Sequence, residues 1–135
     1  MVGGTESDGR LTINSGGVVS GVISEDEGFL TLMGLASGVS GVIDVNGGTF
    51  NSTAIAVGGP GSATLIVRNG GTVTLPFDKA ALSPEFRQSF IIVAADPGAT
   101  ALLQVIDGTL NSGEMLDIGY INPDSAIEAQ AVRLS

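Results

Sequence analysis

The chain has 135 residues, enough for one domain but too few for a catalytic domain beside a binding domain. Hydrophobic residues make up 43% of it, aromatic residues only 4%, and 21 residues are glycine, so the core must be aliphatic and the composition favours short strands over helices. Five basic against fourteen acidic residues give a formal net charge of −9, which argues against nucleic-acid partners and anionic membrane surfaces.

Two residue types that carry much of protein chemistry are missing from the sequence. Without Cys there is neither a disulfide framework nor a thiolate metal site, and without His the commonest zinc ligand and general base is missing. The first residues do not show the basic and then apolar pattern of a signal peptide, and no stretch of eighteen apolar residues occurs. We therefore expect a soluble, non-enzymatic protein without a metal or another cofactor.

The main signal along the chain is an internal repeat, which follows an expected N-terminal arm at residues 1–9 and extends through a single domain at residues 10–135. One phrase consists of an apolar-x-apolar triplet, a Gly-containing turn and a further apolar or β-branched pair. Its four copies start at Leu11, Ile43, Leu65 and Leu103. A second apolar-x-apolar phrase falls between them, and its four copies start at Leu30, Ile55, Ile91 and Leu116. Each repeat thus holds two strand phrases.

The spacing of the repeats predicts two inserted loops. The second glycine of the turn lies at Gly17, Gly48, Gly71 and Gly108, with spacings of 31, 23 and 37 residues. The shortest spacing gives the bare rung, and the two longer ones require extra chain. We place this extra chain at about residues 20–28, which include the acidic run Glu25–Glu27, and at residues 76–89.

These short triplets predict an all-β fold, a right-handed parallel β-helix (β-solenoid) of about four rungs with two inserted loops. In a strand the outer two residues of a triplet point to one face, so stacked rungs would build a continuous aliphatic core. The alternative is an antiparallel meander, in which the Gly pairs would mark two-residue hairpins. The residues expected to point into the core are Leu11, Ile13, Leu30, Leu32, Ile43, Val45, Ile55, Val57, Leu65, Val67, Leu103, Val105, Leu116 and Ile118.

The phrases at Gly61–Val67 and Asn69–Val73 resemble a known bacterial repeat. They are similar to the G-S-G-T-L-x-V and G-G-x-V pattern of autotransporter passengers and PEP-CTERM surface proteins, with looser matches over about residues 10–120. The resemblance implies a parallel β-helix at a cell or virion surface. A short acidic chain with no signal peptide or translocator looks more like a phage surface component, such as a capsid decoration protein or a fibre or spike segment.

Acidic side chains are the candidates for chemistry. Asp44, Asp107 and Asp117 could serve as paired carboxylates of a polysaccharide-cleaving enzyme. Asp44 and Asp117 occupy the outward middle position of their triplets, and no Lys, Arg or His accompanies them at matching rung positions, so we interpret them as solvated surface. The run Glu25–Glu27 could hold calcium, but it lacks the EF-hand spacing and is better explained as an exposed loop. We predict no catalytic, cofactor-binding or metal-binding residue.

The segment Pro76–Ser89 differs from the rest of the chain because it is rich in Phe and basic residues. Ser83 followed by Pro84 predicts the start of a short helix. We predict a partner interface on this segment, formed by Phe77, Leu82, Phe86 and Arg87. The alternative is that these side chains fold back and cover the flank of the solenoid itself.

The leading hypothesis is a non-enzymatic virion surface protein that assembles with itself, as a trimer, and binds a capsid or tail protein. Open solenoid ends must be covered, and the N-terminal arm, the loop at residues 76–89 and a strand within Ala126–Leu134 are candidates to cover them. One alternative is a fragment of a bacterial autotransporter-type adhesin at the cell surface. A polysaccharide-degrading enzyme would need aligned carboxylates in a groove, which the sequence does not indicate.

Overall fold

Strands account for all the regular secondary structure that a computed structural model describes. The described residues are 2–3, 6–20, 30–75, 90–93, 100–113, 115–118 and 132–134. Their strands are β1 (Gly9–Asn14), β2 (Val18–Ser20), β3 (Leu30–Met33), β4 (Ser40–Asn46), β5 (Thr49–Asn51), β6 (Ala54–Val57), β7 (Ser62–Arg68), β8 (Thr72–Thr74), β9 (Phe90–Val93), β10 (Thr100–Ile106), β11 (Thr109–Asn111), β12 (Met115–Ile118) and β13 (Val132–Leu134).

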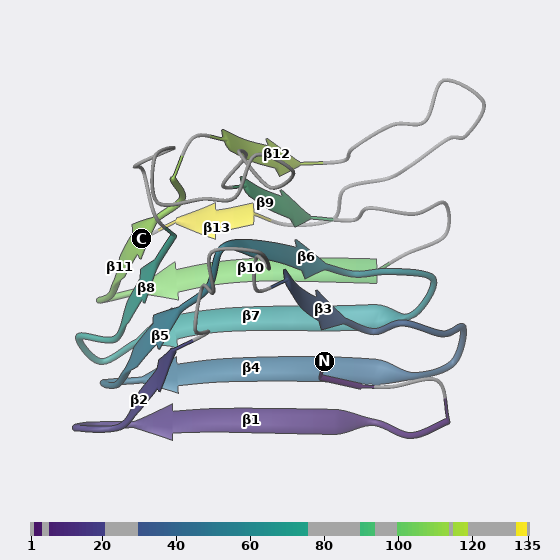
Figure 1. Cartoon of the computed structure of the whole chain (residues 1–135), viewed down its shortest axis with the longest axis horizontal. Helices are drawn as coiled ribbons and strands as arrows, with labels where there is room; N and C mark the ends of the chain where they lie inside the picture. The colour runs from purple at the N-terminus through teal and green to yellow at the C-terminus, as the bar shows by residue number, and fades with distance from the viewer. Residues whose placement is uncertain are drawn as a thin grey trace, which may run out of the picture.

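The strands stack into three parallel sheets. The first sheet has the order β1-β4-β7-β10-β13, the second β11-β8-β5-β2 and the third β12-β9-β6-β3. Neighbours in a sheet are therefore three strands apart in the chain, and Figure 1 shows β1, β4, β7 and β10 lying one above the other. Every strand pair is parallel. The predicted all-β, solenoid-like stacking is thus confirmed, and the antiparallel meander is excluded for the described strands.

The register shows how much chain separates stacked strands. Gly9 pairs with Gly41, 32 positions later, whereas Ser40 pairs with Ser62, only 22 positions later, and Ser62 pairs with Thr100, 38 positions later. These values differ by one from the glycine spacings because the turns after β4 and β10 are one residue shorter than those after β1 and β7. The long separations fall where the two inserted loops are predicted, and both loops, apart from Ser20, lie outside the described residues.

The core lies between the three sheets and consists mainly of aliphatic columns, with Phe50 of β5 as its largest fully buried side chain. In the first sheet Ile43, Leu65 and Leu103 stack in register and are fully buried. The predicted inward orientation is confirmed by burial for Ile13, Ile43, Val45, Ile55, Val57, Leu65, Val67, Leu103 and Val105. Leu11 and Leu116 pack against this core while remaining partly exposed. The side chains of Leu30 and Ile118 lie outside the described part of the structure.

The prediction for β3 was wrong, because the strand faces the core in the other frame. Thr31 pairs with Ile55 and Met33 pairs with Val57, and both Thr31 and Met33 are buried whereas Leu32 is only half-buried. The buried Thr31 hydroxyl is compensated, since its Oγ1 lies 2.8 Å from Ser52 Oγ in a hydrogen bond. Alternation along Leu30–Met33 allows either Leu30 and Leu32 or Thr31 and Met33 to face the core, and each pair contains an apolar residue. The strand takes the second orientation, with Met33 paired with the buried Val57.

Both ends of the chain add to the stack. Val2 of the expected N-terminal arm forms a parallel bridge with Met33, and its N–H donates to the Leu32 carbonyl at 2.9 Å. At the other end, β13 falls within the predicted strand region Ala126–Leu134 and pairs with β10 over three residues. The arm and the C-terminal strand therefore extend the third and the first sheet respectively.

The buried columns predict that a charge placed inside them unfolds the domain. Val67 is fully buried, so Val67→Asp should cost several kcal/mol, comparable with the roughly 5–15 kcal/mol of a whole domain. Thr64→Asp in the same strand is the matched control, since Thr64 is half-buried on the opposite face. Circular dichroism during thermal unfolding should show a folded control and an unfolded Val67→Asp variant. Near-native stability of Val67→Asp would contradict this packing.

Candidate functional site

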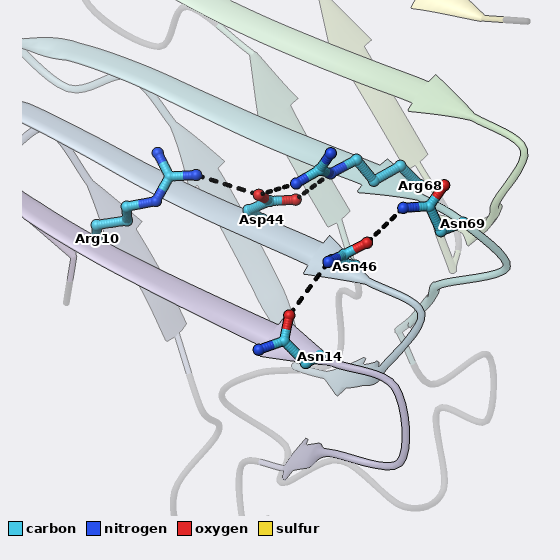
Figure 2. Close-up of polar contacts among 6 residues, drawn as sticks. All are labelled: Arg10, Asn14, Asp44, Asn46, Arg68 and Asn69. Carbon is cyan, nitrogen blue, oxygen red and sulfur yellow. Dashed lines mark hydrogen bonds and ion pairs between the residues drawn. The ribbon is translucent and has the colours of Figure 1, made fainter.

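The most developed polar cluster in the described structure lies on the outer face of the first sheet. It is centred on Asp44 in the middle of β4, with Arg10 on β1 and Arg68 at the end of β7 (Figure 2). Strand alternation sends these three side chains outward, because their neighbours Leu11, Val45 and Val67 face the core. The cluster thus follows directly from the register of the stack.

Two guanidinium groups hold the Asp44 carboxylate. Arg68 donates two hydrogen bonds, from Nε to Oδ1 and from Nη2 to Oδ2, both at 2.9 Å. Arg10 donates a third, from Nη2 to Oδ2 at 3.1 Å. The carboxylate side chain is only 2% exposed, whereas Arg10 and Arg68 remain 59% and 42% exposed. The arginines therefore cover Asp44 while their own outer N–H groups face solvent.

This geometry corrects the prediction that Asp44 is a solvated surface residue. At matching register positions Asp44 has Thr12 and Ile66 as neighbours, so the prediction that no basic residue stands there is literally true. Arg10 and Arg68 instead stand two positions away along their strands, on the diagonals. Long side chains reach diagonal neighbours across a sheet. Aligning the triplets and then searching two positions either side of each Asp would have found both arginines.

Electrostatics keep Asp44 ionised. The hydrogen bonds from Arg68 lower the pKa of Asp44, and the charges of Arg68 and Arg10 reinforce this against the opposing effect of burial. In return the carboxylate raises the pKa of Arg68. A general acid needs a raised pKa near the working pH. Asp44 has the opposite shift and a saturated set of partners, so its arrangement is that of a structural ion pair linking three stacked strands.

Asparagine side chains form a second outward feature at the end of the same strands. Asn46 Nδ2 donates to Asn14 Oδ1 at 3.1 Å, and Asn69 Nδ2 donates to Asn46 Oδ1 at 2.5 Å (Figure 2). A shorter ladder on the second sheet joins Asn51 Nδ2 to Ser20 Oγ at 2.8 Å. These hydrogen bonds run along the stacking direction, so they align successive turns.

The glycine turns that follow the ladder are required by close packing. Gly70 has a φ of +77°, in the left-handed region that side chains rarely adopt. A Cβ atom on Gly71 would collide with the backbone carbonyl oxygen of Val45 in β4, the strand that pairs with β7. The first glycine thus permits the corner, and the second lets the neighbouring backbone approach.

The candidate carboxylates do not share one sheet face. Asp44 lies in β4 of the first sheet, Asp107 is exposed in the turn after β10, and Asp117 belongs to β12 of the third sheet. The side chain of Asp117 lies outside the described structure, as do Glu25–Glu27. The predicted interface residues Phe77, Leu82, Phe86 and Arg87, and the short helix expected at Ser83, also fall outside the described residues.

In comparisons with known proteins, no protein-family model, no curated protein and no solved structure matches the chain. The resemblance of the repeat to autotransporter and PEP-CTERM proteins therefore stays a prediction. Within the described ranges, no three His, Cys, Asp or Glu side chains gather as a metal site. In that same part of the chain, no helix is long and apolar enough to span a membrane.

The ion-pair cluster predicts a pH-dependent effect of removing the charge of Asp44. Because its folded-state pKa is lowered, the carboxylate stabilises the fold above its unfolded-state value of about 4, and this stabilisation is lost as the pH falls through the folded-state pKa. Asp44→Asn should therefore lower the free energy of unfolding by about 1–3 kcal/mol at pH 7. Denaturant unfolding should show the gap from the parent closing towards pH 2.

Asp107→Asn is the matched control for that measurement, since Asp107 is exposed and Asn tolerates its positive φ of +50°. It should change the stability at pH 7 by no more than about 0.5 kcal/mol. A stability loss in Asp44→Asn that stayed constant from pH 7 to pH 2 would show that the carboxylate charge is not responsible.

Proposed function

We propose that this chain is a non-enzymatic structural and interaction protein, a right-handed parallel β-helix of about four rungs that acts as a virion surface component. In this proposal it assembles with itself as a trimer and attaches to a capsid or tail protein through the loop at residues 76–89. Its described residues contribute a rigid scaffold, whose register is held by the core columns, the Asp44 ion pairs and the asparagine ladder.

The observation that carries the proposal is the end of the stack at β1 and β2, on which no described strand is stacked. Both strands are outermost in their sheets. Leu11 is partly exposed there, whereas Ile43 stacked on it is fully buried, and Val18 on the outer face of β2 is 66% exposed. Unpaired strand edges and partly exposed core residues favour association with another chain. In an assembly a second chain can pair with this edge and cover Leu11, whereas in an isolated monomer both stay in contact with solvent.

The chemistry of the outer face also supports a scaffold rather than an enzyme. Asp44 makes three hydrogen bonds to arginines and has a lowered pKa, so it does not serve as a poised acid or base. The net charge of −9 favours solubility of an exposed particle component. The repeat phrases at Gly61–Val67 and Asn69–Val73, which suggested a surface protein, form β7, the following turn and β8.

A fragment of a bacterial surface adhesin is the second candidate, and the same end of the stack favours it. In a longer passenger, preceding rungs would cover β1 and β2, and the isolated segment would expose them. The two candidates differ in solution behaviour: an adhesin segment should aggregate without a defined stoichiometry, whereas the proposed virion protein should form particles of one size.

Light scattering coupled to size-exclusion chromatography tests the proposal. The expected particle mass is three times the chain mass of 13.5 kDa, or a multiple of that trimer. A Phe86→Ala, Arg87→Ala double variant should keep the β-rich circular dichroism of the parent but lose the trimer, because interface aromatic and Arg side chains contribute about 2 kcal/mol or more each.

The matched control is Ile106→Ala, which removes an exposed aliphatic side chain outside the loop at residues 76–89. This control should assemble like the parent. A monomeric parent, or a loop variant that assembles as well as the control, would disprove the proposed role of the loop at residues 76–89.

A further inference from the structure

The free edge of β1 is the longest terminal edge among the described strands. β1 contains six residues and pairs only with β4, so the backbone groups on its other side have no partner within the described structure. At the opposite end of the same sheet the outermost strand, β13, has three residues. A free edge of this length is a ready template for a further strand.

The sequence of this end carries little charge, a property that it shares with residues 45–77. Residues 9–20, which form β1, the turn and β2, contain one basic and no acidic residue, whereas the whole chain carries −9. Two copies repel each other through their acidic surfaces, and this repulsion is weakest where each presents a segment without acidic residues. β1 itself therefore brings no acidic side chain to a contact with a second copy, and the exposed Glu6 and Asp8 lie before its first residue.

We propose that β1 pairs with β1 of a second copy of this chain, antiparallel about a two-fold axis that passes beside Thr12. A two-fold axis relates identical strands in opposite directions, so each contact is made twice. The contact is independent of the proposed three-fold assembly: with the trimer it joins two trimers end to end, and without it the product is a dimer.

The side chains of β1 are self-complementary in this register. Centring the pair on Thr12 places Leu11 opposite Ile13 of the second copy, and Arg10 opposite Asn14. Directly opposed residues of an antiparallel pair lie on the same face. The inward residues Leu11 and Ile13 thus meet each other and cover the partly exposed end of the core, and Arg10 meets an uncharged amide instead of a like charge.

Strand length favours the two-fold pairing of β1 with β1 over a head-to-tail contact between two copies. In a head-to-tail contact the six-residue edge of β1 would meet the three-residue β13, leaving half of β1 unpaired. The two-fold contact matches six residues with six. It also closes on itself, whereas head-to-tail contacts repeat and produce open filaments.

Thr12→Cys tests the contact directly. The chain has no Cys, and Thr12 is exposed on the outer face, so the new thiol is the only one present and is not required for the core. Opposed Cβ atoms in an antiparallel pair lie about 4.5–5.5 Å apart, close to the separation a disulfide spans. Thr64→Cys is the matched control, since β7 is flanked by strands on both sides.

Under mild oxidation of about 10 µM protein, Thr12→Cys should form a covalent dimer on the order of a hundredfold faster than Thr64→Cys, because pairing raises the local thiol concentration to the millimolar range. Labelling of each unfolded variant with a thiol reagent confirms that both cysteines are free. Separately, Thr12→Lys should halve the particle mass of the parent by placing like charges opposite each other.

Equal cross-linking rates for the two cysteine variants, together with an unchanged mass for Thr12→Lys, would overturn the two-fold contact. Slow cross-linking of Thr12→Cys that is accompanied by indefinite filaments would also overturn it and favour head-to-tail stacking. If the Phe86→Ala, Arg87→Ala variant loses the trimer while Thr12→Cys still cross-links fast, the two-fold contact is supported independently of the trimer. The reverse outcome, an intact trimer with slow Thr12→Cys cross-linking, would remove the contact alone.

Discussion

Parallel, in-register stacking is the constraint on which the rest of the structure depends. No described strand is longer than seven residues, and such a strand cannot bury its apolar face by itself. Ile43, Leu65 and Leu103 are excluded from solvent only because each lies over the next. A shift of one residue would send these side chains outward, so burial of the core requires this particular register.

The same register organises the polar groups on the outside. Asp44 can be held by Arg10 and Arg68 because stacking places the three strands side by side with offsets of two residues. Burying a carboxylate is costly without partners, so a slipped register would leave Asp44 poorly compensated. The asparagine ladder adds the same kind of selectivity at the turns, where Asn46 and Asn69 each donate to the asparagine of the preceding repeat. Core and surface therefore specify one alignment.

Periodicity in the sequence was sufficient to predict the stacked strands and most inward residues, since a triplet such as Ile43-Asp44-Val45 has apolar residues on only one face of the strand. It failed at Leu30–Met33, where both frames contain apolar residues and only the packing of Met33 against the next strand decides. It also missed the partners of Asp44, because diagonal contacts depend on a register that glycine spacings give only to within one residue. Composition alone carries no information about such contacts.

The central claim, that consecutive repeats stack in parallel register, is tested most directly by nuclear Overhauser effects between backbone protons of an isotope-labelled sample. The account predicts cross-strand amide contacts linking Ile43 with Leu65 and Val45 with Val67, 22 positions apart, as in β4 and β7. It also predicts no close pair of α protons between β4 and β5. Short distances between α protons mirrored about Gly47 and Gly48, as in an antiparallel hairpin, would contradict it.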